Sequence, residues 1–107
     1  MSNLFDSAYA ALTAVHGMSV QARQGNPNSK RWYVMSSAHL THVVVKLTEM
    51  ADDNVIVQAT ACLPNSFIKV EGIAYNVSAA SLAGALNSVD YDIKRIEKAC
   101  TLYANAN

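Results

Sequence analysis

Charged residues, glycine, proline and cysteine are all scarce in this sequence. Charged side chains make up 15% of the 107 residues, whereas hydrophobic side chains make up 51%. Disordered chains combine low hydrophobicity with high net charge, so this composition excludes them. Four glycines, two prolines and two cysteines also exclude collagen-like, low-complexity and disulfide-dense proteins. We therefore expect residues 1–107 to fold as a single globular domain with one hydrophobic core.

Long hydrophobic runs and N-terminal positive charge are missing as well. No run approaches the ~18 apolar residues of a membrane-spanning helix, and the first basic residue is Arg23. A secretory signal peptide would carry positive charge before its hydrophobic segment. Cys62 and Cys100 both occupy positions that hydrophobic spacing assigns to a core, which predicts two buried free thiols. These features predict a cytoplasmic protein with no membrane partner.

The sequence also lacks the motifs of common catalytic and cofactor sites. Its four glycines are too far apart to form a phosphate-binding loop. His39 and His42 have the i, i+3 spacing that places two ligands on one helix face, but a metal site needs at least one further ligand. No serine or cysteine has a base and an orienting group at a recognisable spacing. We expect no enzymatic activity, no cofactor and no metal.

Hydrophobic spacing predicts a helix and a β-hairpin at the start of the chain. Residues 3–16 carry hydrophobic side chains at helical spacing, and Gly17 is well placed to end that helix. Residues 18–23 and 30–35 alternate between hydrophobic and polar, which is typical of strands. The Gly-Asn-Pro-Asn-Ser sequence at 25–29 predicts a long loop between these two strands.

Residues 37–52 fit two different patterns. The run Val43-Val44-Val45 has high β propensity. Hydrophobic residues from Leu40 to Ala51 also recur at the spacing of one helix face. This spacing favours a helix over 37–52, and a strand is the alternative.

The second half of the chain is expected to form another β-hairpin followed by two helices. Residues 55–63 alternate clearly, and residues 67–77 continue as a second strand after a Pro-Asn-Ser turn. Gly72, within that strand, is a candidate β-bulge. A small-residue helix over 79–86 precedes a final helix over 89–103. The sequence therefore predicts an α+β domain of order α-β-β-α-β-β-α-α, whose antiparallel sheet of two β-hairpins carries helices on one face.

The final helix is expected to have a buried face and a solvated face. Hydrophobic spacing assigns the buried face to Val89, Ile93, Ile96, Cys100 and Tyr103. The solvated face is expected to carry the charged residues Asp92, Lys94, Arg95, Glu97 and Lys98. We therefore expect these charged side chains to contact water.

The formal net charge is zero, but the two halves of the chain carry opposite charge. Residues 1–46 have four basic side chains and one acidic side chain, a net charge of +3. Residues 47–107 have four basic and seven acidic side chains, a net charge of −3. Opposite charges on one chain favour self-association, because unlike patches of two copies can meet across a symmetry axis.

The first hairpin combines basic and aromatic residues. The candidate residues for binding a partner or nucleic acid are Arg23, Lys30, Arg31, Trp32 and Tyr33. Cations neutralise phosphates and aromatic rings stack on bases, so single-stranded nucleic acid is one possible ligand. In that case Arg31→Ala and Lys30→Ala would weaken binding at low salt and leave thermal stability nearly unchanged. The alternative is that Trp32 anchors the core and the cations keep a loop soluble.

The hydrophobic excess predicts that a second copy covers part of the surface. A second hydrophobic sheet face with Tyr33, Met35, Ile56 and Cys62 would serve this purpose. We expect a non-enzymatic macromolecular interaction protein, a small accessory factor or inhibitor that binds a larger protein and forms a homodimer. The alternative function is a single-stranded nucleic-acid-binding module that uses the hairpin 23–35.

Overall fold

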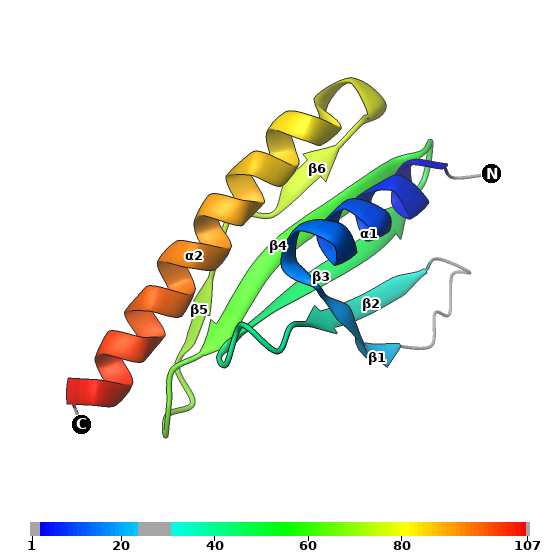
Figure 1. Cartoon of the computed structure of the whole chain (residues 1–107). Coiled ribbons are helices and arrows are strands. Elements are labelled where there is room, and N and C mark those ends of the chain that lie inside the picture. The colour runs from blue at the N-terminus through cyan, green and yellow to red at the C-terminus, as the bar shows by residue number, and fades with distance from the viewer. Residues whose placement is uncertain (1–2, 24–30, 107) are drawn as a thin grey trace.

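The computed structural model describes residues 3–23 and 31–106, with the side chains of all of these except residues 3, 22 and 23. Within this part of the chain, helices α1 (Asn3–His16) and α2 (Leu82–Ala106) lie on the same face of one six-stranded antiparallel sheet (Figure 1). A short 3-10 helix, η1 (Ala79–Ser81), leads into α2. The predicted α+β class is confirmed. Neither helix of the described chain is long and apolar enough to cross a membrane.

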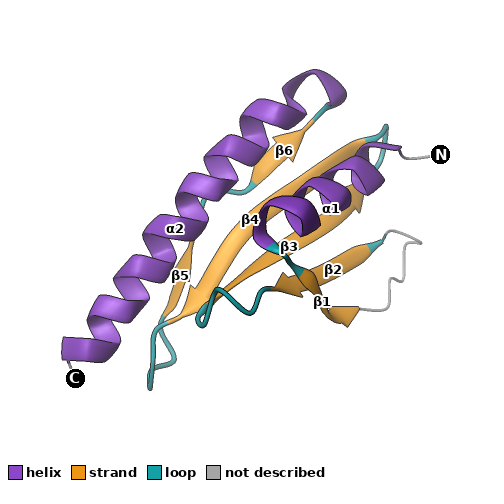
Figure 2. Cartoon of the chain, viewed as in Figure 1, coloured by secondary structure: helices purple, strands orange, loops and turns teal. Residues whose placement is uncertain are grey.

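The sheet joins strands that are mostly neighbours in the sequence (Figure 2). The strands are β1 (Ser19–Arg23), β2 (Trp32–Ser36), β3 (Val43–Met50), β4 (Asn54–Cys62), β5 (Lys69–Glu71) and β6 (Tyr75–Val77). Strands β1 to β4 pair in sequence order, while β5 and β6 both pair with the other edge of β4, one after the other. The strands expected at 18–23, 30–35 and 55–63 are confirmed as β1, β2 and β4.

Residues 37–52 contain strand β3, so the favoured prediction of a helix is wrong and the alternative is correct. Val45 and Leu47 point toward the helices and are fully buried, whereas the alternating residues Val44, Lys46 and Thr48 are partly exposed. The sequence obscures this alternation because the outward-facing Val44 is hydrophobic too. Strand β3 pairs with β2 and β4 on its two sides, and such a central position favours β-branched side chains.

The end of the chain forms one helix where two were expected. Residues 79–86 and 89–103 become η1 and the continuous helix α2. The hydroxyl of Ser88 donates a hydrogen bond to the carbonyl of Gly84 at 3.2 Å, within the helix. Its side chain therefore bonds back into the same helix and does not cap a new one.

Gly72 divides the strand expected at 67–77 into β5 and β6. Its N–H donates to the carbonyl of Ala59 at 2.8 Å, and a Cβ at this position would lie 2.8 Å from Oδ2 of Asp92. The next N–H, that of Ile73, donates to the same Asp92 oxygen at 3.1 Å. A glycine is needed here because the connection between β5 and β6 packs directly against α2.

The two faces of the sheet differ in what covers them. The face under the helices holds the core, which includes Phe5, Leu12, Met35, Val45, Leu47, Val57, Ile93 and Ile96. The opposite face carries the alternate residues of β2, β3 and β4, which are partly or fully exposed. This bare face consists of Trp32, Val34, Val44, Lys46, Thr48, Ile56, Gln58 and Thr60.

Candidate functional site

Five residues were expected to bind a partner or nucleic acid, and the pleat of β2 separates three of them. Arg31 and Tyr33 contact the helix side of the sheet, whereas Trp32 lies on the bare face. Lys30 and the side chain of Arg23 lie outside the described residues. The structure therefore brings Arg31 and Tyr33 together and places Trp32 on the other side of the sheet.

Arg31, directly before β2, forms ion pairs with one residue of β3 and one residue of α1. Its Nη2 donates to Oε2 of Glu49 at 2.6 Å, and its Nη1 donates to Oδ1 of Asp6 at 2.8 Å. Its guanidinium carbon lies 4.1 Å from the ring centre of Phe5. The hydrogen bond to Glu49 raises the pKa of Arg31, although burial lowers it. A cation already compensated by two carboxylates is a poor partner for a phosphate.

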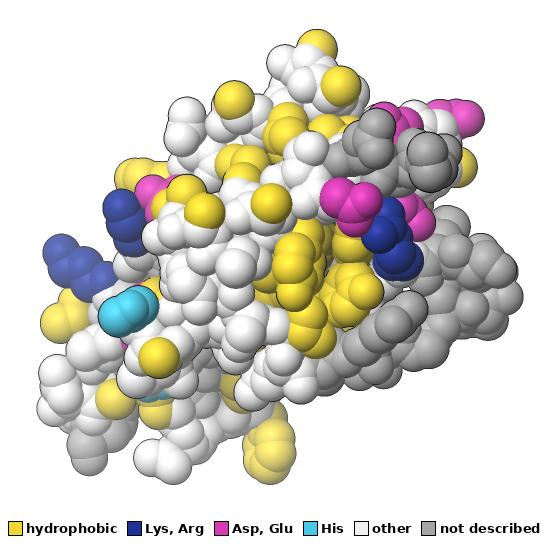
Figure 3. Space-filling model, turned by 45° about the vertical axis from the view of Figure 1, so that its right-hand side comes forward, with side chains coloured by type: hydrophobic (Ala, Val, Ile, Leu, Met, Phe, Trp, Pro, Cys, Tyr) yellow, Lys and Arg dark blue, Asp and Glu magenta, His cyan; other side chains and the backbone are white. Residues whose placement is uncertain are grey.

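Tyr33 and Met35 belong to the covered face, so their assignment to a second hydrophobic face is wrong. The ring of Tyr33 lies 5.5 Å from the ring of Phe5 and 5.8 Å from the ring of Tyr9, centre to centre. Met35 is fully buried in the core. The side of the molecule drawn in Figure 3 shows hydrophobic atoms gathered in its centre, bordered by basic and acidic side chains in contact. The rings of Phe5, Tyr9 and Tyr33 therefore pack together at the border of the core.

The bare face is organised in three cross-strand rows. From β2 toward the other edge the rows are Trp32–Thr48–Ile56, Val34–Lys46–Gln58 and Val44–Thr60, and Glu71 of β5 continues the last row beyond the bare face. The ammonium nitrogen of Lys46 lies 5.8 Å from the ring centre of Trp32, a cation–π contact. Antiparallel sheets that face water usually carry polar residues outward. Half of the eight bare-face residues are hydrophobic.

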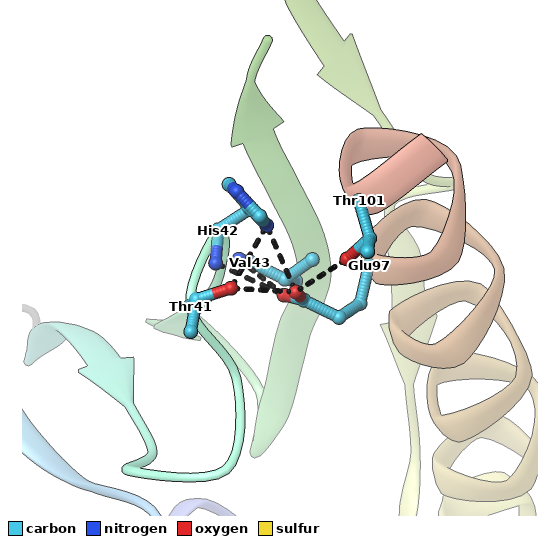
Figure 4. A network of polar contacts seen from close by, with 5 residues as sticks. All are labelled: Thr41, His42, Val43, Glu97 and Thr101. Atoms are coloured by element: carbon cyan, nitrogen blue, oxygen red, sulfur yellow. Dashed lines mark hydrogen bonds and ion pairs between the residues drawn. The ribbon is translucent and has the colours of Figure 1, made fainter. Parts of the chain in front are cut away.

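A second polar feature lies at the entrance to β3, where Glu97 of α2 receives hydrogen bonds from three consecutive residues (Figure 4). Its Oε1 accepts the backbone N–H of His42 at 2.9 Å and that of Val43 at 3.3 Å. Its Oε2 accepts the hydroxyls of Thr41 at 2.9 Å and Thr101 at 3.4 Å. Burial alone would raise the pKa of Glu97, but the hydrogen bonds from His42, Thr41 and Val43 lower it to about 2.

These contacts also fix the orientation of the His42 ring. Nδ1 of His42 lies 2.8 Å from Oε2 of Glu97 and 3.0 Å from the Thr41 hydroxyl oxygen. Because the Thr41 hydroxyl donates its own proton to Glu97, Nδ1 must carry the hydrogen that reaches the carboxylate. The other ring nitrogen points away from Glu97 (Figure 4). An imidazole oriented in this way can accept a hydrogen bond or bind a cation through Nε2.

His42 also lines a shallow concavity at one end of the bare face, together with Cys62, Lys69 and Glu71. His39 and His42 both lie in the connection between β2 and β3, so they do not share a helix. In residues 3–23 and 31–106, no three histidine, cysteine, aspartate or glutamate side chains are placed to hold a metal ion.

The two cysteines have different environments, although both were expected to be buried. Cys100 is fully buried, as expected, and burial raises the pKa of its thiol. Cys62 is exposed at the end of β4, so the prediction that its thiol is buried is wrong. Its thiol donates a hydrogen bond to the carbonyl of Ser66 at 3.0 Å. Of the two thiols, Cys62 is the one that reagents can reach.

Two acidic residues of α2 contact protein where solvation was expected. Asp92 is only 5% exposed and accepts the N–H of Ile73, and Glu97 binds the entrance to β3. A third carboxylate, that of Asp90, lies 2.9 Å from Nε2 of His16 in α1. The sequence showed acidic residues flanking a hydrophobic stripe, but it did not show which segments present backbone N–H groups to them. The carboxylates of Asp92 and Glu97 attach α2 to the rest of the molecule.

No protein family, curated protein or solved structure was found that matches the chain.

Proposed function

We propose that this chain is a non-enzymatic protein-interaction domain, an accessory factor or inhibitor of a larger protein, and that it forms a homodimer. The observation that carries this proposal is the bare face. Both helices cover one side of the sheet, and the other side presents Trp32, Val34, Val44 and Ile56 among polar residues.

The composition of the bare face supports protein binding over simple solvation. Burying an exposed aliphatic or aromatic side chain at an interface contributes favourable free energy, roughly 25 cal/mol for each Å² of apolar surface removed from water. Tryptophan is among the residues most enriched at the centres of interfaces. The polar members, such as Thr48, Gln58 and Thr60, keep the uncovered face soluble, so a reversible association fits better than a permanent one.

Single-stranded nucleic-acid binding remains the second candidate, because Trp32 and Lys46 lie together on the bare face. An exposed ring can stack on a base while a nearby cation contacts phosphate. The candidate surface then moves from the hairpin 23–35 to the bare face, since Arg31 is engaged by Glu49 and Asp6.

One experiment separates these functions, because Trp32 is the only tryptophan of the chain. Sedimentation velocity is measured while the protein concentration is raised, and Trp32 fluorescence is measured while single-stranded DNA or RNA is added. The proposal predicts a mass above 11.5 kDa. A constant mass up to high micromolar concentration would exclude the homodimer. Quenching by single-stranded DNA or RNA that salt reverses would favour the nucleic-acid function.

A further inference from the structure

We infer that a second copy of this chain covers the β3 and β4 part of the bare face, with Lys46 of one copy paired to the partner's Glu71 on either side of a two-fold axis that passes over β4. This inference rests on the proposed homodimer and assigns its surface and geometry. An isologous contact of this kind forms each pair twice, because the two-fold axis repeats it.

The strand register places the two charged residues on opposite sides of β4. Lys46 of β3 lies opposite Gln58, and Glu71 of β5 lies opposite Thr60. A two-fold axis that lies in the plane of the interface and runs roughly along β4, above Gln58 and Thr60, exchanges the two sides. It therefore brings β3 of one copy over β5 of the other.

Lys46 of one copy and the partner's Glu71 remain offset along the strand direction, because Lys46 is level with Gln58 and Glu71 is level with Thr60. This offset of two residues corresponds to about 7 Å, which the two side chains can bridge. Sheets that pack face to face cross at about 30°, and one sense of this rotation shortens the offset. Lysine and glutamate have long side chains, so Lys46 can reach the partner's Glu71 across such an interface.

Both charges are without an ionic partner in the part of the chain that the structure describes. Among the described residues, neither Lys46 nor Glu71 forms an ion pair. Lys46 contacts the Trp32 ring, and Glu71 accepts a hydrogen bond from the amide of Gln58 at 3.2 Å. Two uncompensated charges of opposite sign on one surface are what a self-complementary contact requires.

The same charges disfavour the obvious alternative geometry. A two-fold axis over β3, the middle strand of the sheet, would place Lys46 opposite its own copy, and facing like charges are costly. An axis over β4 avoids this conflict and places Ile56 near its own copy, a hydrophobic contact. The price is a smaller overlap of the two sheets, so we expect a weak, concentration-dependent dimer.

Charge reversal tests the pairing directly. Lys46→Glu and Glu71→Lys should each raise the dimer Kd at least about tenfold, since like charges then face each other twice. The double variant K46E/E71K restores opposite charges and should return the Kd close to that of the wild type. Lys98→Glu, the same change on the exposed side of α2, is the matched control and should leave the Kd unchanged.

The native cysteine supplies an independent measure of geometry. Cys62 follows Thr60 by two residues on β4, so the proposed axis brings the two copies of this exposed thiol near each other. A short bis-maleimide should therefore link wild-type chains through Cys62, and Cys62→Ser should abolish the linked species.

The outcomes distinguish this inference from the proposed function. A wild-type chain that remains monomeric at every concentration overturns both. A wild-type dimer that neither charge reversal weakens, or that the double variant fails to restore, overturns the Lys46–Glu71 pairing and leaves the homodimer intact. A dimer without cross-linking at Cys62 contradicts the axis over β4.

Discussion

The covered and bare faces of the sheet are made from the same strands and often from the same residue types. Val44 and Val45 are adjacent and identical, yet Val45 is fully buried under the helices while Val44 is partly exposed. The pleat sends neighbouring residues to opposite faces, and only one face has helices over it. Position in the sheet therefore decides the environment of each valine, and a hydrophobic residue on the bare face is available for another molecule.

The largest expected effect is a difference in folding stability between substitutions on the covered face and substitutions on the bare face. Leu47→Ala removes a fully buried side chain and should lower the free energy of unfolding by about 3 kcal/mol, because it leaves a cavity in the core. Ile56→Ala deletes a side chain of similar size from the bare face and should cost about 1 kcal/mol or less. Urea unfolding of both variants at low protein concentration measures the two values. Equal losses would contradict the division into two faces.

Acid should weaken the attachment of α2 to the covered face. The pKa of Glu97 lies near 2 in the folded protein, below its ordinary value of 4.5, so ionised Glu97 stabilises the folded state above about pH 4.5. That contribution, about 3 kcal/mol for a shift of this size, is lost as the pH falls from 4.5 toward 2.

Thermal unfolding from pH 6 to pH 2.5 measures this loss, and Glu97→Gln is the matched variant. The variant should be less stable at neutral pH and should lose less stability on acidification, because it has no carboxyl group at this position to protonate. A variant with the same pH profile as the wild type would show that other carboxyl groups cause the loss.

A smaller effect is expected at Arg31, on the border of the covered face. Arg31→Ala removes the contacts with Glu49, Asp6 and the Phe5 ring and should lower stability by about 1 kcal/mol, since the side chain is 32% exposed. The sequence-based nucleic-acid interpretation expected nearly unchanged stability. Circular dichroism melting distinguishes the two expectations, and Lys98→Ala provides an exposed control.

The sequence predicted the fold class and the elements whose two faces differ in polarity. Strand β4 was predicted correctly because its alternate residues Gln58 and Thr60 are polar. Strand β3 was not, because its outward-facing Val44 completes a helical spacing with Leu40 and Leu47. The hydrophobic residue that β3 presents on the bare face is therefore also the reason why the alternating pattern of β3 could not be recognised in the sequence.

The candidate site was less predictable than the fold. Trp32 was identified from its type, but its separation from Arg31 and Tyr33 depends on the pleat of β2. Glu97 gave no signal in the sequence, because its role depends on N–H groups at the entrance to β3, more than fifty residues earlier. Contacts between distant segments cannot be derived from local periodicity.

Dimerisation through the bare face is tested most directly by a pair of 1H–15N NMR spectra, one of dilute and one of concentrated protein. A dimer with its axis over β4 predicts concentration-dependent shifts for Lys46, Thr60 and Glu71 on β3, β4 and β5, and constant signals for the outer side of α2. Shifts centred instead on Tyr91 and Leu102, which are 68% and 59% exposed on α2, would contradict it. Identical spectra at both concentrations would contradict it as well.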